Sequence, residues 1–162
     1  MNIPVQPAQP DPLTRREFCA YACQAGSLLA AGTFAACGGS STSPSSTNAP
    51  PLSAVSGTVS GRTISVAIDG ASALAAVGSA ATVQTSLGTF LISRTAQDSF
   101  SALTAICTHE QCTVSGFASN QFVCPCHGSR FTTAGAVANG PATRSLQSYA
   151  TQFANGVLTF AV

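Results

Sequence analysis

Two short segments constrain this chain more than any other feature. The first box is Cys107-Thr108-His109-Glu110-Gln111-Cys112, and the second box is Cys124-Pro125-Cys126-His127-Gly128-Ser129-Arg130-Phe131. Both of the 2 histidines of the chain, and four of its 7 cysteines, lie in these two boxes. Imidazole and thiolate are the protein ligands that zinc and iron prefer. The sequence therefore predicts one metal site to which both boxes contribute.

The spacing within the boxes narrows the choice of metal. Cys107 and His109 form a C-x-H pair, and Cys124 and His127 form a C-x-x-H pair. Together the boxes resemble those of the Rieske iron–sulfur family, in which two histidines replace two cysteines on one iron of a [2Fe–2S] cluster. The resemblance covers roughly 53–162. It implies that Cys107 and Cys124 bind one iron and that His109 and His127 bind the other.

Two further cysteines of the boxes are left without a metal. In the family that the boxes resemble, residues placed like Cys112 and Cys126 form a disulfide, which would hold the two loops together over the cluster. A tetrahedral zinc site built from two cysteines and two histidines is the alternative, but it leaves Cys112 and Cys126 unexplained. A catalytic Cys–His pair is less favoured, because no third polar group is placed to orient a base.

The rest of the chain predicts an all-β fold. Ala, Ser, Thr, Gly and Val dominate, and 63–68 alternates with Ile64, Val66 and Ile68 on one face. Further strands are expected over 82–85, 89–94, 100–106, 148–153 and 156–162, and a hairpin over 114–123 that turns at 119–120, with a short helix in 71–76 as a weaker expectation. The resemblance implies a Rieske-type antiparallel β-sandwich with a small cluster-binding insert of two loops, over about 105–135.

The N-terminal third carries features of an exported protein. Arg15 and Arg16 lie in a segment that resembles a twin-arginine signal, and 19–36 is an uncharged, moderately apolar run. Cys37 follows in a segment that resembles a lipobox, although Phe34 replaces the usual Leu. Lipidation at Cys37, an uncleaved helical anchor and ordinary cleavage near residue 36 remain alternatives. We expect a signal or anchor over 1–37, a flexible linker over 38–52 and a Rieske domain over 53–162.

The resemblance also implies roles for residues beyond the ligands. Ser129 matches the serine whose hydroxyl donates to a cluster sulfide, and Phe131 stands where high-potential members carry a tyrosine. Gly140, Pro141 and Ala142 match a loop that shields the cluster from solvent. These residues are expected to line the cofactor, with Phe131 holding the reduction potential below the upper end of the family's range.

These features lead to one functional expectation. The chain is expected to be an exported Rieske protein that carries single electrons between redox partners, in the periplasm or on the outer face of the cytoplasmic membrane, and is not catalytic alone. The formal net charge of +1 suggests no nucleic-acid partner. Because Glu110 should hinder docking into an apolar quinone pocket, a cytochrome c or an envelope oxidoreductase is the favoured partner. The alternatives are the Rieske subunit of a cytochrome bc-type complex and the small subunit of an oxidase such as arsenite oxidase.

Overall fold

The computed structural model describes residues 49–162, and these form strands joined by turns and loops. The strands run, in chain order, over β1 Ser53–Ser56, β2 Thr58–Ser60, β3 Thr63–Ala67, β4 Ala80–Thr85, β5 Gly88–Ala96, β6 Ser99–Thr104, β7 Gly116–Ala118, β8 Gln121–Val123, β9 Arg130–Thr132, β10 Val137–Asn139, β11 Ser148–Tyr149, β12 Thr151–Ala154 and β13 Val157–Ala161. Within this part of the chain, no helix is long and apolar enough to cross a membrane.

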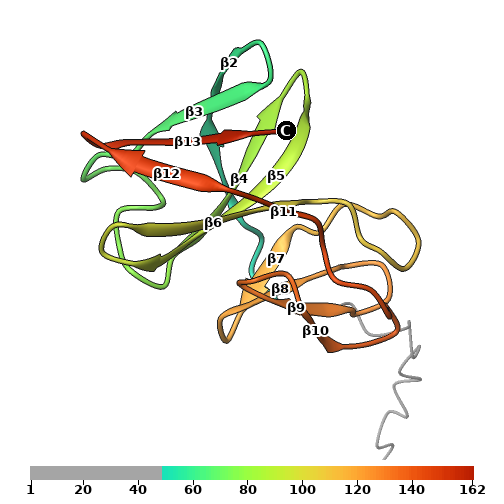
Figure 1. The fold of residues 1–162 in the computed structure, drawn as a ribbon. Coiled ribbons are helices and arrows are strands. Elements are labelled where there is room, and N and C mark those ends of the chain that lie inside the picture. The colour runs from blue at the N-terminus through green and yellow to red at the C-terminus, as the bar shows by residue number, and fades with distance from the viewer. Residues whose placement is uncertain (1–48) are drawn as a thin grey trace, which may run out of the picture. The chain divides into compact units, whose positions relative to one another are not determined.

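Two sheets form the β-sandwich (Figure 1). One has the strand order β1-β4-β5-β6-β11, and the other has the order β12-β13-β3-β2. All their pairings are antiparallel except that of β1 with β4. The chain passes from the first sheet to the second at Gly57, where a Cβ atom would lie 2.8 Å from Val83. This close approach explains why glycine separates β1 from β2.

The period-two pattern of β3 becomes one face of the sandwich core. Ile64 and Val66 are fully buried, and Ile68 is nearly so, as the sequence predicts. Their partners come from both sheets and share a large apolar side chain: Val83, Phe90, Ile92, Phe100, Leu158 and Phe160. The rings of Phe90 and Phe160 meet edge to face at 5.3 Å between centroids. The all-β fold predicted from the sequence is therefore confirmed.

A third sheet extends from the end of the sandwich. Its strand order is β10-β9-β8-β7, so each strand pairs with its neighbour in the chain (Figure 1). It packs on a second apolar cluster that includes Leu91 and Leu103 from the sandwich and Phe122 and Phe131 from the small sheet. This shared core fixes the small sheet, and with it both boxes, to strands β5 and β6.

Some sequence predictions differ from the structure. Residues 71–76 form turns rather than a helix, held by Ala71 N–H and Leu74 N–H donating to the side chains of Asp69 and Ser72. The single strand expected over 148–153 divides into β11, which pairs with β6, and β12, which pairs with β13. The short strands β1, β2, β9 and β10 were not predicted. Both expected hairpins, around 119–120 and around 155–156, are present.

Candidate metal centre

The two boxes share one pattern of backbone hydrogen bonds, and each is followed by a strand of the small sheet. The first box lies between β6 and β7, and the second lies between β8 and β9. In the first, Gln111 N–H donates to Cys107 O at 2.9 Å and Cys107 N–H donates to Cys112 O at 2.8 Å. In the second, Gly128 N–H donates to Cys124 O and Cys124 N–H donates to Ser129 O. Each loop therefore begins with a cysteine and closes on the residue five positions later.

The fourth residue after each of these cysteines has a left-handed backbone. Gln111 has a φ of 57° and Gly128 a φ of 77°. Glycine adopts this conformation without cost, whereas glutamine does so only where the surrounding structure holds it. The hydrogen bonds of the first box and the disulfide at its end supply that restraint. The two loops are thus alike in backbone but differ in sequence.

Two free thiols lie buried at the base of the loops. Cys107 is 1% exposed and Cys124 is 2% exposed, and neither forms a disulfide. Burial, with a further contribution from the neighbouring Cys107 thiol, raises the pKa of the Cys124 thiol above its usual value. A thiol in these surroundings gives up its proton readily only when a cation compensates the charge. The pair therefore suits a metal better than it suits nucleophilic chemistry.

The two imidazoles lie together at the surface. The ring centroids of His109 and His127 are 5.0 Å apart and the rings meet edge to face. Their side chains are 29% and 44% exposed. Among residues 49–162, the structure thus places the four predicted ligands in two loops joined by the disulfide, with the thiols buried and the imidazoles exposed.

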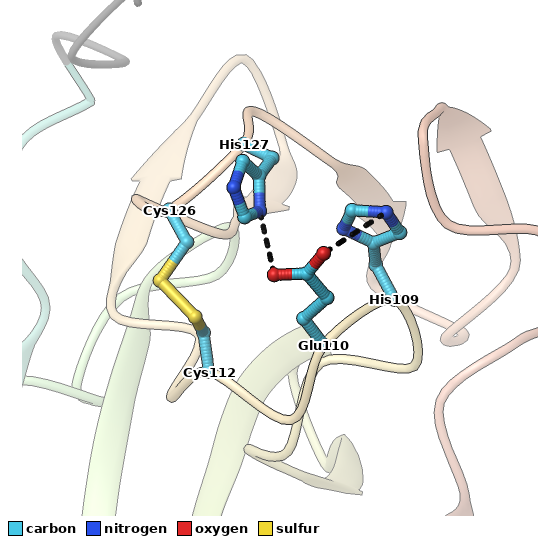
Figure 2. Close-up of a disulfide and its surroundings, with 5 residues drawn as sticks. All are labelled: His109, Glu110, Cys112, Cys126 and His127. Carbon is cyan, nitrogen blue, oxygen red and sulfur yellow. Dashed lines mark ion pairs between the residues drawn. A yellow bond between two sulfur atoms is a disulfide. The ribbon is translucent and has the colours of Figure 1, made fainter.

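A disulfide joins the two boxes beside the imidazoles. Cys112 and Cys126 are bonded, with 6.5 Å between their Cα atoms (Figure 2). It closes a loop with a sequence separation of 14 residues that contains β7 and β8. The disulfide that the family resemblance implied is therefore confirmed.

Glu110 makes a contact that the sequence analysis missed. Its carboxylate lies between the two rings, with 4.0 Å from Oε1 to His109 Nε2 and 3.7 Å from Oε2 to His127 Nδ1 (Figure 2). The contact with His109 follows from their adjacency. The contact with His127 follows from the disulfide, because Glu110 is two residues from Cys112 while His127 is next to Cys126. The disulfide pairing was the signal that would have predicted it.

The segment 140–144 lies against both boxes. Ala142 N–H donates to Ser129 Oγ of the second box at 3.0 Å. Thr108 Oγ1 of the first box donates to Arg144 O at 2.5 Å. Gly140 and Pro141 are exposed, and the bond between them is cis. The structure therefore brings Ala142 and Ser129 into contact, while Gly140 and Pro141 form the outer side of the segment.

Phe131 and an open groove also lie near the predicted ligands. Phe131 is fully buried on β9, within the apolar cluster that also holds Cys107 and Cys124. The groove, of about 380 Å³, runs past His109 and is lined by Ile106 and Arg144 among others. Ile106 is 55% exposed, so an apolar side chain stands in solvent near His109.

These residues fit a metal group held by thiolate and imidazole. Within residues 49–162, the two free thiols and the two histidines lie in the two facing loops. Ser129 is fully buried and its hydroxyl accepts the Ala142 N–H, which leaves its proton to be donated elsewhere. A β-sandwich that carries such a two-loop site defines a class of metalloproteins with mixed cysteine and histidine ligands.

The family model described as "Rieske [2Fe-2S] domain" matches residues 65–150. The chain belongs to this family, whose domain binds a [2Fe–2S] cluster. The family match favours the cluster over the zinc site that the same four side chains could also build.

Among curated proteins, the chain is similar to iron–sulfur subunits of cytochrome b6-f complexes. It is 56% identical over 46 residues to the chloroplastic subunit of Bigelowiella natans, covering 28% of this chain and 18% of that protein. It is 45% identical over 60 residues to subunit 1 of the cyanelle of Cyanophora paradoxa, covering 36% of this chain and 25% of that protein. The matches thus span a quarter or less of these relatives' length.

Among solved structures, the plasma membrane Rieske protein PetC3 of the cyanobacterium Synechocystis PCC 6803 is 35% identical, with a TM-score of 0.46, covering 50% of this chain and 84% of that one.

Proposed function

We propose that this chain carries single electrons between redox partners at the cell envelope, through one [2Fe–2S] cluster. The observation that supports this most is the arrangement of two buried free thiols and two exposed imidazoles in disulfide-linked loops. When bound, such a cluster supplies one-electron redox chemistry. The cluster would be held by Cys107 and Cys124 on one iron and by His109 and His127 on the other.

The protein residues around this site have distinct tasks in the proposal. Cys107 and Cys124 lie in an apolar cluster, which excludes water from the inner side. His109 and His127 are exposed, so a partner can approach within a short distance of them. Ser129 donates its hydroxyl proton towards the site, and the segment 140–142 covers it. The relatives named as cytochrome b6-f subunits support an electron-transfer role.

A polar redox protein is the proposed partner. Glu110 places a carboxylate between the two imidazoles, and a desolvated carboxylate would weaken insertion into an apolar quinone pocket. A cytochrome c or an envelope oxidoreductase would meet the same surface without that cost. The Rieske subunit of a cytochrome bc-type complex and the small subunit of an oxidase remain the competing assignments. Turnover of purified protein with a soluble cytochrome c, against turnover with a quinol in the assembled complex, would separate them.

The decisive test of the cluster is low-temperature electron paramagnetic resonance of the dithionite-reduced protein, with iron and zinc measured alongside. We expect about two irons per chain and a rhombic signal typical of histidine-ligated [2Fe–2S] centres. Replacement of His109 or His127 by Cys should remove that signal or shift it. A protein that contains zinc and gives no signal would overturn the proposal.

The location at the envelope is a separate proposal. The predicted twin-arginine segment and Cys37 lie outside the described residues, so it depends on the sequence alone. We expect the Arg15→Lys/Arg16→Lys variant to accumulate in the cytoplasm, whereas the wild type is exported. Cys37→Ser should release the exported protein from the membrane if the lipobox is used. Membrane retention of Cys37→Ser would favour an uncleaved anchor, and a soluble wild type would favour ordinary cleavage.

A further inference from the structure

Segment 140–142, which in the proposed function covers the site, is attached to the second box by one buried hydrogen bond. Ala142 N–H donates to Ser129 Oγ at 3.0 Å, and the two residues are 13 apart in the chain. Ser129 is 0% exposed and Ala142 is 4% exposed. Water therefore cannot replace either partner without opening the segment, so the bond is worth more than a comparable one at the surface.

This hydrogen bond determines how the serine hydroxyl can point. The oxygen has two lone pairs and one proton, and the Ala142 N–H occupies one lone pair. Within residues 49–162 no protein acceptor for the hydroxyl proton is found. With one lone pair engaged, the rotation of the hydroxyl is restricted to orientations that direct the proton away from Ala142.

The backbone of the serine is itself fixed to the site. Ser129 O accepts the N–H of Cys124 at 2.9 Å, so the residue belongs to the hydrogen-bonded loop of the second box. Pro141, which comes before Ala142, has no N–H to offer, so Ala142 provides the first amide after the Gly140-Pro141 bond. Further along, Leu146 N–H donates to Gly135 O at 2.9 Å, a bond that does not involve Ser129.

We propose that the backbone amide of Ala142 is a positioning group for the cluster. It orients the Ser129 hydroxyl so that the proton is donated into the site, and the same bond keeps segment 140–142 closed. The reduction potential would then depend on an amide outside both boxes. This inference depends on the proposed cluster, since the hydroxyl needs an acceptor there.

The first test removes the amide proton and leaves Ser129 in place. Ala142→Pro deletes the donor without a change of charge, and Ala142→Gly is the matched control that keeps it. Protein-film voltammetry should show a lower potential for Ala142→Pro, because a less oriented donor stabilises the reduced state less. The shift should be at least half that of Ser129→Ala, and Ala142→Gly should stay near the wild type.

A double-mutant cycle tests whether the Ala142 amide acts on the reduction potential through the Ser129 hydroxyl. If the amide acts through the hydroxyl, Ala142→Pro should produce little further shift in a Ser129→Ala background. Shifts that simply add would contradict the inference, as would an unchanged potential for Ala142→Pro. Electron paramagnetic resonance of each variant shows whether the cluster is present. Its absence from the wild type would overturn the proposed function, whereas its presence with additive shifts overturns only this inference.

A second measurement does not depend on how the chain tolerates proline. In Ser129→Ala, hydrogen exchange at the Ala142 amide should accelerate about fivefold, as expected for the loss of about 1 kcal/mol from one hydrogen bond. The Leu146 amide, bonded to Gly135 O, is the internal control and should be unaffected. Mass spectrometry with residue-level fragmentation measures both amides in one sample. Equal exchange at Ala142 in the wild type and Ser129→Ala would overturn the role of this hydrogen bond in keeping segment 140–142 closed.

Discussion

Two residues of the boxes, Glu110 and Phe131, each allow a test of the electron-transfer proposal. Glu110 adds a charge to an exposed pair of imidazoles. Phe131 is a fully buried ring on β9, with no polar atom to offer the nearby thiols. Neither is a predicted ligand, so substitution should change the potential without removing the cluster.

Glu110→Gln should raise the reduction potential. The carboxylate favours the less negative, oxidised state, and the amide keeps its shape without its charge. A unit charge about 6 Å from a redox centre in water-like surroundings contributes about 0.7 kcal/mol, or about 30 mV for one electron. Voltammetry at low salt measures the shift, which should shrink as salt is added.

Asp98→Asn provides the matched control for Glu110→Gln. Asp98 is exposed in the turn between β5 and β6, at the opposite end of β6 from the first box. The Asp98→Asn substitution removes the same charge from the molecule, but the reduction potential of this variant should match that of the wild type. Equal shifts for the two variants would mean that net charge, not the position of Glu110, controls the potential.

Phe131→Tyr should also raise the potential. A buried tyrosine hydroxyl requires an acceptor, and the ligand thiolates lie in the same cluster of side chains. One added hydrogen bond worth about 1 kcal/mol would raise the potential by about 40 mV. Phe117→Tyr is the control, since Phe117 is partly exposed on β7. No rise in Phe131→Tyr, with the cluster intact, would contradict the placement of this ring beside a ligand.

Among the elements of the fold, the disulfide between the boxes is the one that most directly joins the two halves of the site. Cys112→Ser/Cys126→Ser should reduce the free energy of unfolding by about 3 kcal/mol, the value expected for a closed loop of about 15 residues. Cluster loss, followed by the decay of visible absorbance, should accelerate. A double variant that retains its cluster as long as the wild type would show that the two backbone loops hold the cluster without the disulfide.

The elements also show what could be predicted from the sequence. Strand β3 could be predicted from its alternation of apolar and polar residues. The turn at Asn155-Gly156 could be predicted because these residue types favour the left-handed backbone that they adopt, with φ values of 52° and 74°. Strands β9 and β10 are three residues each and pair with an irregular register, so they leave no period to detect. The division of 148–153 was also unreadable, since it depends on which distant strand each half meets.

The same contrast applies to the candidate site. The residue types and spacing of the boxes were sufficient to predict the Rieske family with its [2Fe–2S] cluster and, through the family, the disulfide. The assignment of the four ligands stays a prediction. The Ser129–Ala142 bond, the Thr108–Arg144 bond and the Glu110–His127 contact were not predicted. Each joins residues from separate segments whose approach is set by tertiary structure.

At the scale of the whole molecule, the sandwich contains a buried cation, Arg94, that has no part in the proposed electron-transfer site. Arg94 is 8% exposed and donates to the carbonyls of Leu74, Ala75 and Gln97. Its guanidinium also lies over Phe100, 5.3 Å from the ring centroid. It thus stabilises the turns of 71–79, where strand β5 supplies backbone partners at Gly78 and Ser79 and the Arg94 side chain binds the carbonyls of Leu74 and Ala75.

Arg94→Met should therefore destabilise the fold without altering the potential. Leaving buried carbonyls unsatisfied costs about 2 kcal/mol, measurable by urea denaturation of the cluster-loaded protein. Arg62→Met is the control, because Arg62 is exposed and its side chain donates to the Val162 carbonyl. A change of potential in Arg94→Met equal to that of Glu110→Gln would show that the sandwich and the site are not independent.

The small sheet has a consequence for how the chain folds. Within this sheet, β7 to β10 pair with sequence neighbours, and one isolated bridge joins Gly116 of β7 to Pro51. In the sandwich, by contrast, β13 must find β3, which lies more than 80 residues earlier. Contacts between neighbours form faster than contacts across long loops. We expect the metal-binding loops to become protected before the sandwich closes, as pulsed hydrogen exchange would show. The small sheet, which receives the cofactor, would then be folded before the sandwich that supports it.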